Sequence, residues 1–282
     1  MRYLAIFISS LILLISIFIS QTLQFYDGKM HVVFCNVGQG DAVFIRTPNR
    51  NDILIDGGPD DKILGCLENN LPFWDRQIDA IFLTHPHADH LTGLTYVLER
   101  YEVRHYLSTG IEGNTEIYRK LRDFLAEEGV SAKNLKASDR LIFGQDTAFQ
   151  ILWPTVTYLE NWREGAYGDD PNSTSLVIKV SFGSFDVLFT GDSESEILNQ
   201  ISLSPAEILK VPHQGSKGAL TSEDLERIKP EIGIIFVGKN SYGHPSREII
   251  DLLNSRGVKT LRTDRDGTVK IVTDGKSWSV KK

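Results

Sequence analysis

The chain has 282 residues, of which 41% are hydrophobic, and its formal net charge at pH 7 is −7. That length supports one substantial core or two closely packed halves. The acidic balance argues against a large basic surface that would bind nucleic acid by charge alone. The two cysteines, Cys35 and Cys66, lie in or near apolar segments and are not spaced as a metal knuckle. We therefore expect buried free thiols and no disulfide.

Residues 1–24 form a separate segment, in which Arg2 is the only charged residue. A positive start followed by an apolar run of this length is typical of a signal peptide or a short membrane-spanning helix. The sequence around Phe18-Ile19-Ser20 is a poor cleavage site, which favours an uncleaved anchor, with cleavage as the alternative. Arg2 predicts that the body lies outside the cytoplasm, although Lys29 on the other flank weakens this asymmetry.

Residues 31–282 are predicted to form one domain of short strands interleaved with amphipathic helices. Strands are expected at 31–37, 42–45, 53–55, 81–84, 103–107, 149–153, 175–180, 186–190, 208–211 and 232–237, and helices from 91, around 117–125 and at 248–253. The polar stretch 160–170 is the longest irregular segment. We expect it to be a mobile loop that overhangs the functional site.

The most informative stretch follows the strand at 81–84, where three histidines and an aspartate occur within six residues. The Pro-containing turn presents His85 and His87 on one side, and Asp89 and His90 begin the next helix. Imidazole and carboxylate are the ligands that hold zinc and its divalent neighbours. A helix cap would explain Asp89, but not three of the seven histidines of the chain. The stretch therefore predicts a metal site, and four such groups suit two ions.

Other predicted strands also end in residues of the ligand type. Asp56 ends a buried strand before two glycines, which suits a group that orients ligands from behind, although Asp-Gly-Gly is also a common turn. Asp192, His213 and His244 each follow a further strand. A turn explains any one of them, but their recurrence predicts an active site where strand ends converge.

These motifs resemble the metallo-β-lactamase superfamily. Within it, the best match is the C-terminal hydrolase domain of the competence protein ComEC, and it covers residues 31 to 275. The narrower resemblance is carried by Asn36-Val37-Gly38-Gln39-Gly40-Asp41-Ala42, Asn172-Ser173-Thr174-Ser175-Leu176-Val177, Lys210-Val211-Pro212-His213-Gln214-Gly215-Ser216 and Tyr242-Gly243-His244-Pro245. ComEC is a polytopic channel protein, whereas this chain has a single hydrophobic segment.

The resemblance implies an α+β fold, the αββα sandwich of two mixed β-sheets with helices on the outer faces. It also implies two divalent metal ions, zinc or manganese. By position, the first ion would be bound by His85 and His87, the second by Asp89, His90 and His213, with Asp192 bridging and Asp56 orienting the ligands.

Two departures from the family pattern bear on the metals. Asn172 stands where most of the superfamily has a histidine, so we expect a weaker first site that tolerates manganese. Gln214 stands where the ComEC branch usually has a second histidine next to His213, and we expect it to be a lost auxiliary contact.

The implied reaction is hydrolysis of a phosphodiester, with DNA as substrate in a competence or DNA-uptake context and a ComEC-like channel as partner. Asp89 would lie beside the nucleophilic water. His244 would contact the phosphate or protonate the leaving oxygen. Ser216 and Lys217 are expected near the ligands or the substrate, although Lys217 is equally explained as a solvated surface lysine.

Two other functions stay open. One is an extracytoplasmic phosphodiesterase or esterase that acts on a wall polymer or phosphocholine, which the acidic net charge favours. The other is a non-catalytic, metal-stabilised binding module of a DNA-uptake assembly, and the nearly intact ligand set argues against it.

Overall fold

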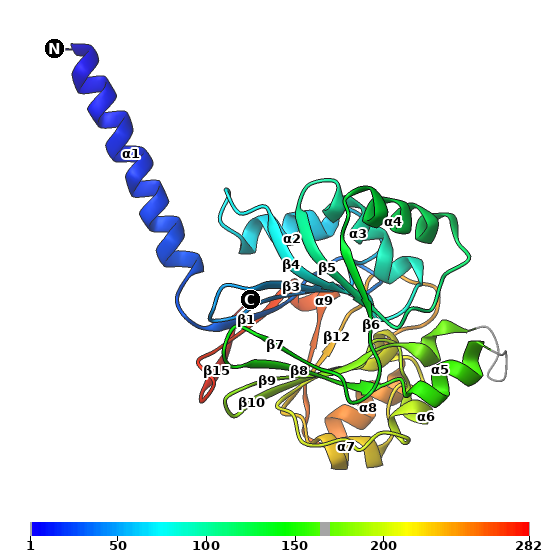
Figure 1. Cartoon of the computed structure of the whole chain (residues 1–282). Helices are drawn as coiled ribbons and strands as arrows, with labels where there is room; N and C mark the ends of the chain where they lie inside the picture. The colour runs from blue at the N-terminus through cyan, green and yellow to red at the C-terminus, as the bar shows by residue number, and fades with distance from the viewer. Residues whose placement is uncertain (1, 164–169, 282) are drawn as a thin grey trace.

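The computed structural model describes residues 2–163 and 170–281. Beyond the N-terminal helix α1 (Arg2–Phe25), which projects from the body, two β-sheets lie face to face with helices on both outer faces (Figure 1). The predicted αββα sandwich is therefore confirmed.

Both sheets are mixed, as expected. In spatial order, the first contains β15 (Trp278–Lys281), β14 (Val269–Thr273), β1 (Met30–Phe34), β2 (Val43–Arg46), β3 (Asp52–Ile55), β4 (Gln77–Phe82), β5 (Glu102–Ser108) and β6 (Ser131–Asn134). The second contains β13 (Lys259–Arg262), β12 (Ile232–Ile235), β11 (Ile208–Lys210), β10 (Phe185–Phe189), β9 (Val177–Phe182), β8 (Thr147–Trp153) and β7 (Arg140–Phe143). Strands β3 to β6 are parallel, and so are β10 to β13.

Three apolar clusters hold these layers together. In β1, Val32 and Phe34 point between the sheets, while Val33 points to the outer helices. This alternation follows from the period of two along a strand, and it buries both faces of the first sheet. Full burial of one such side chain contributes roughly 1.5–3 kcal/mol. The third cluster lies between the second sheet and its outer helices.

The outer helices belong to two groups. The first sheet is covered by α2 (Lys62–Asn70), α3 (Ala88–Leu98) and α4 (Glu116–Glu127), and the second by α5 (Val156–Arg163), α6 (Ser195–Leu198), α7 (Ser222–Ile228) and α8 (Arg247–Ser255). A short helix α9 (Thr263–Asp266) and the 3₁₀ turns η1 (Pro171–Thr174) and η2 (Pro212–Gly215) complete the assignment. Helices α2, α5, α6, α7 and α9 were not predicted from the sequence.

The expectation of free thiols is wrong, because Cys35 and Cys66 form a disulfide with 5.9 Å between their Cα atoms. Cys35 follows β1 and lies, like Val33, on the helix-facing side of the sheet. Helix α2 packs on that face and carries Cys66. The two sulfurs meet because the strand and the helix bury the same side.

The predicted loop at 160–170 is also wrong in its first part. Residues 160–163 complete helix α5, and Asp170 caps η1, where its side chain accepts a hydrogen bond from the amide of Asn172. Residues 164–169 lie outside the described residues.

Candidate metal centre

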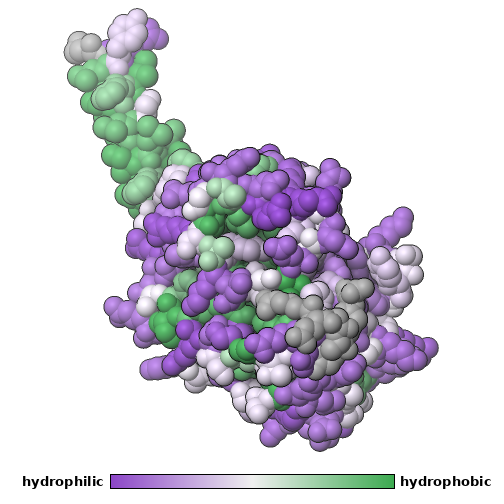
Figure 2. Space-filling model, turned by 45° about the vertical axis from the view of Figure 1, so that its right-hand side comes forward, coloured by the Kyte–Doolittle hydropathy of each residue, from purple (hydrophilic) through white to green (hydrophobic). Residues whose placement is uncertain are grey.

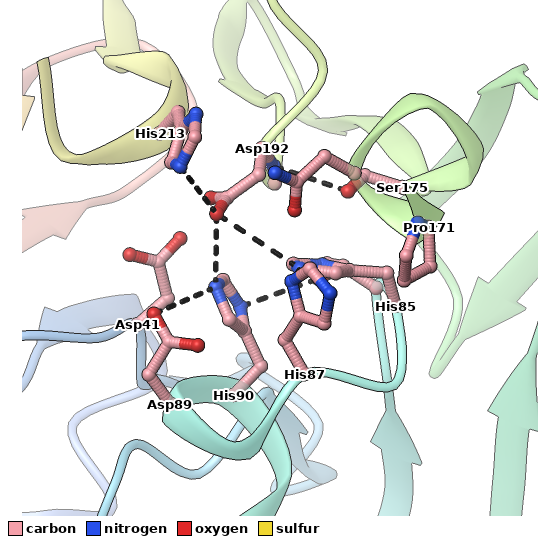
Figure 3. A network of polar contacts seen from close by, with 12 residues as sticks. Asp41, His85, His87, Asp89, His90, Pro171, Ser175, Asp192 and His213 are labelled. Carbon is pink, nitrogen blue, oxygen red and sulfur yellow. Dashed lines mark hydrogen bonds and ion pairs between the residues drawn. The ribbon is translucent and has the colours of Figure 1, made fainter. Parts of the chain in front are cut away.

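The predicted ligands converge where strands of both sheets end (Figure 3). His85 and His87 follow β4, and Asp89 and His90 lie in the first turn of α3. The second sheet contributes Asp192 after β10 and His213 in η2 after β11. The chain thus brings together residues more than 100 positions apart in the sequence.

The carboxylate of Asp192 lies at the centre of this group. Its Oδ2 is 3.3 Å from Nε2 of His90, 3.9 Å from Nε2 of His85 and 3.8 Å from Nε2 of His213. Figure 3 shows these contacts reaching Asp192 from both sides of the site. The remaining predicted ligands lie beside them. Oδ2 of Asp89 is 3.6 Å from Nε2 of His90, and Nδ1 of His87 is 3.1 Å from Nε2 of His85.

Asp56 lies behind the ligands. Its Oδ2 is 2.8 Å from Nδ1 of His90, while its two oxygens also accept from the amide and the hydroxyl of Thr84, each at 2.8 Å. The hydroxyl of Thr84 is 3.1 Å from Nδ1 of His85. This arrangement points the Nε2 atoms of both imidazoles at Asp192. Asp56 has a φ of +58°, a backbone conformation that aspartate tolerates better than most residues.

The loop before β2 closes over the start of α3. At Gly40 (φ +141°), a Cβ would lie 2.2 Å from the carbonyl oxygen of Asp89, so only glycine fits. The next amide, of Asp41, donates to that same carbonyl at 3.3 Å. This close approach brings the Asp41 side chain under the site.

The sequence analysis missed a buried lysine under the ligands. Lys210 ends β11 and is 2% exposed. Its ammonium pairs with Asp41, donates to the carbonyl of Gly191 at 2.7 Å and lies 3.6 Å from Oδ1 of Asp192. Burial alone would lower the pKa of Lys210, but the two carboxylates outweigh it and raise that pKa above its ordinary value. A positive charge therefore lies beneath the central carboxylate.

Glu194 is a second residue that the sequence analysis missed. Its Oε1 is 2.8 Å from Nδ1 of His213 and also accepts from the hydroxyl of Ser216. The hydrogen bond with His213 lowers the pKa of Glu194. A carboxylate on the far nitrogen of a ligating histidine fixes the ring and raises its basicity. The Ser216 side chain therefore meets the ligand group through Glu194, while its amide donates to the carbonyl of His213 at 2.9 Å.

The expectation that Gln214 is a lost contact is wrong. Its side chain is buried, donates to Oδ2 of Asp89 at 3.5 Å and accepts from Gln39 at 3.4 Å. Gln39 in turn accepts from the amide of Gly238 at 3.1 Å. The amide side chain thus links the first turn of α3 to η2.

The remaining predicted residues lie at different distances from the centre. Asn172 in η1 and His244 line the cavities at the site, and the His244 ring is 5.4 Å from that of His213. Burial and the charge of His213 lower the pKa of His244. Lys217 is not brought into the group: its side chain is 81% exposed and its ammonium lies 3.5 Å from Glu248.

Two cavities open beside the ligands. One of about 610 Å³ is lined by residues that include His87, Asp89, His213 and His244, and one of about 350 Å³ lies between η1 and α6. The first cavity is large enough for a segment of a polymer or for a drug-sized molecule. It gives a substrate direct access to Asp89 and His213.

The donor set fits divalent cations. His85, His90 and Asp192 each present a ligand atom within 4.8 Å of the others. Within residues 2–163 and 170–281, the buried Nε2 of His90 and Oδ1 of Asn172 have no hydrogen-bond partner. Lone pairs left in this way at a cluster of imidazoles and carboxylates are what a cation would satisfy.

The pKa shifts of the histidines in the cluster also favour a bound cation. Burial, reinforced by the neighbouring His90, lowers the pKa of His85 well below its ordinary value. For His90, burial acts in the same direction, but Asp192, Asp89 and Asp56 outweigh it and raise its pKa well above the ordinary value. The carboxylates around His90 therefore favour a positive charge at its ring, which a metal ion would supply.

Residues 35–239 match the model of the metallo-β-lactamase superfamily. The chain belongs to this superfamily. Its members typically bind divalent metals, in agreement with the cluster described above.

Two curated competence proteins are similar to most of the chain. The chain is 29% identical over 272 residues to ComE operon protein 3 of Bacillus subtilis, a match to 86% of this chain and 33% of the relative. It is 25% identical over 250 residues to competence protein ComA of Neisseria gonorrhoeae, which covers 86% of this chain and 32% of that protein. The predicted similarity to ComEC-like proteins is confirmed. The chain spans about a third of the length of these relatives.

Solved structures of low sequence identity share the fold. The diiron β-hydroxylase CmlA of Streptomyces venezuelae has a TM-score of 0.54 at 16% identity, covering 87% of this chain and 54% of that one. Zinc-bound PqqB of Methylobacterium extorquens has a TM-score of 0.55 at 12% identity, and the match covers 83% of this chain and 98% of that one. At these identities the likeness establishes the fold alone.

Proposed function

We propose that the chain is a metal-dependent phosphodiesterase that acts on DNA in a DNA-uptake context. The observation that carries the proposal is the convergence of three imidazoles on Asp192, with Asp89 at the mouth of an open cavity. Similarity to competence proteins over most of the chain supports the context. A ComEC-like channel protein is the partner that this context implies.

Two divalent ions, zinc or manganese, would be held by residues on both sides of Asp192. His85 and His87 would serve the first ion and Asp89, His90 and His213 the second, with Asp192 between them. When bound, such ions supply Lewis-acid activation of water and neutralise phosphoryl oxygens. Asn172 would add an amide oxygen to the first ion, which favours manganese more than an imidazole would.

The residues of the chain itself would position the substrate. Asp89 is half-exposed at the cavity, where its carboxylate can orient a water molecule. His244 lines the same cavity and would donate a hydrogen bond to the phosphate or protonate the leaving oxygen. Asp56 and Glu194 would hold the imidazoles in place. Lys217 would meet only a substrate that extends over the rim.

We further propose that residues 1–24 anchor a hydrolase domain of residues 31–282 outside the cytoplasm. Helix α1 is long and apolar enough to cross a membrane, with a mean hydropathy of 2.5 over its most apolar window. A signal peptide passes the same test. The disulfide between Cys35 and Cys66 supports an oxidising compartment.

The test is hydrolysis by the purified, manganese-loaded full chain. It should cleave bis-p-nitrophenyl phosphate and then DNA, in single- or double-stranded form and without strong sequence preference, because no base-reading motif is present. Asp89→Asn should lower turnover by at least about 100-fold, since it removes a ligand-type carboxylate at the cavity. The matched control is Asp251→Asn on α8, where the exposed carboxylate pairs only with Arg247 among the described residues.

Two outcomes would replace the proposal. Cleavage of bis-p-nitrophenyl phosphate without cleavage of DNA would favour an extracytoplasmic phosphodiesterase or esterase with a non-nucleic substrate, which the net charge of −7 supports. No cleavage of either substrate, with both metals bound, would leave a non-catalytic binding module. His244→Ala separates roles within the site: kcat should fall while metal content stays unchanged.

A further inference from the structure

The C-terminal end of helix α1, called its root below, is fixed to the body by specific side-chain contacts. Phe25, the last residue of the helix, is buried, and the hydroxyl of Tyr26 donates to Oδ2 of Asp75 at 3.2 Å. Arg46 donates to the same oxygen at 3.3 Å, and its guanidinium lies 5.0 Å from the centre of the Tyr26 ring. Asp75 therefore ties the segment that contains it to the end of α1.

That segment is a tight turn with two aromatic residues at its corners. The amide of Asp75 donates to the carbonyl of Pro72 at 2.9 Å, which places Phe73 and Trp74 at the two central positions. Such positions usually hold glycine, asparagine, aspartate, serine or proline. Phe73 is nevertheless 64% exposed, and Trp74 is half-buried. Neither the geometry of the turn nor the core of the body explains this pair.

The aromatic turn, residues 72–75, contacts α1 directly. The Trp74 ring stacks on Phe18 with 4.7 Å between centroids, and Phe73 meets Trp74 edge to face at 4.9 Å. Phe18 lies seven residues before the end of the helix, which is about 10 Å along its axis. Figure 2 shows the apolar surface of α1 rising from a predominantly polar body. The aromatic turn extends this apolar surface at the level where the helix leaves the body.

We propose that the aromatic turn is a second membrane contact, in which Phe73 and Trp74 insert into the interfacial layer of the phospholipid bilayer that α1 enters. Aromatic side chains are enriched at this depth because their rings suit a boundary that is apolar on one side and wet on the other. Exposed Arg50, with its guanidinium 4.4 Å above the Tyr26 ring, and Lys29 lie at the helix root, where lipid phosphates would meet them.

The proposal rests on retention of α1 in the membrane and adds a role for the body. A single helix can tilt in the bilayer, and a domain fixed to its end would tilt with it. Asp75 links the aromatic turn to the helix end through Tyr26, so insertion at both points would fix the tilt of the domain against the bilayer. The second contact would therefore fix the orientation of the domain on the membrane as well as its attachment.

The distribution of tryptophan makes the proposal testable in the full chain. The four tryptophans, at 74, 153, 162 and 278, all lie outside α1. In phosphatidylcholine vesicles with brominated acyl chains, quenching of tryptophan fluorescence therefore reports contact between the body and the bilayer. We expect partial quenching that Trp74→Phe removes. Trp278→Phe, at a half-buried position on β15, is the matched control and should leave it unchanged.

Sedimentation of the same vesicles separates this proposal from the anchor. A chain that sediments with the vesicles but is not quenched, or that is still quenched after Trp74→Phe, overturns the second contact while α1 remains an anchor. A chain that does not sediment overturns both. Phe73→Ser supplies an independent variant: because this ring is exposed, the fold should be retained while the quenching falls by about half or more.

Discussion

The two ends of the sandwich differ in how their buried charges are paired. At the end near α1, Arg46 binds Asp52 through two hydrogen bonds of 2.7 and 2.6 Å, and both side chains are less than 5% exposed. At the other end, Lys210 lies between Asp41 and Asp192 without a bidentate partner. A planar guanidinium matches one carboxylate, whereas an ammonium is a point charge shared between two.

The difference shows where a buried carboxylate is fully matched within the chain and where it is not. Near α1, the bidentate pair satisfies both oxygens of Asp52, and of the pair only Nη1 of Arg46 is buried without a hydrogen-bond partner among the described residues. At the strand ends, Nε2 of His90 and Oδ1 of Asn172 are buried without a hydrogen-bond partner among the described residues, although Oδ2 of Asp192 lies 3.3 Å from that Nε2. A cation bound among these imidazoles and carboxylates would satisfy both atoms.

Arg46→Met should cost about 3–5 kcal/mol of the free energy of unfolding, because it leaves a buried carboxylate without its partner. The loss should be the same with and without manganese, since this pair lies far from the ligands. Urea unfolding measures it. Arg122→Met, at an exposed pair with Asp123, is the control and should change stability by less than about 0.5 kcal/mol. A loss at Arg46 that manganese reverses would contradict the contrast.

Lys210→Met should cost about 1–3 kcal/mol in the metal-free protein, because it leaves two buried carboxylates without their cation. The cost is smaller than at Arg46 because the ammonium makes no bidentate pair with one carboxylate, as the guanidinium of Arg46 does with Asp52. Added manganese should recover part of the loss, since it supplies positive charge at Asp192. The melting temperature with and without manganese tests this, and equal shifts in the variant and the parent would count against it.

Glu194→Gln should weaken metal binding by roughly 10–100-fold, because the amide no longer holds His213 as a carboxylate does. Competition with a chelator measures the affinity without reference to activity. Ser216→Ala is the matched control: it removes only the hydroxyl that donates to Glu194, so its effect should be smaller. Unchanged affinity in Glu194→Gln would mean that His213 is not a ligand.

The smallest effect is expected at Asp274, in the turn between β14 and β15 at the α1 end. Hydrogen bonds from the amides of Ser277 and Lys276 lower its pKa to about 2, from an ordinary value of 3.8. A folded-state pKa below the unfolded one stabilises the protein above pH 3.8, and this contribution is lost as the pH falls towards 2. The difference in urea midpoint between the parent and Asp274→Ala should shrink over that interval. A difference that does not change with pH would exclude the carboxylate as its source.

The sequence could predict short strands interleaved with helices, and the meeting of the ligands at strand ends, because both depend on local patterns, whereas the sandwich came from the family resemblance. His85 to His90 form one compact motif, and each later ligand-type residue follows an apolar run that reads as a strand. The mixed sheets came from the family resemblance, and the structure bears them out.

The residues that were missed depend on packing between segments distant in the sequence. The disulfide required knowledge that α2 packs on the helix-facing side of β1, where Cys35 lies. Lys210 reads as an ordinary polar residue of a strand, and the loop at Gly40 brings its partner Asp41 to it from a distant part of the sequence. Glu194 reads as a turn residue until η2 places His213 against it.

Strand β4 has a further consequence for how the molecule would stand on a membrane. Arg76 alone separates the strand from the aromatic turn, and Leu83 and Thr84 separate its end from His85. Its six residues span about 20 Å, at roughly 3.3 Å per residue. With the turn in the interface, β4 would act as a spacer that holds the cavity beside His87 and Asp89 above the headgroups. A lipid would be out of reach there, whereas a polymer arriving from the aqueous side could pass through the cavity without leaving water.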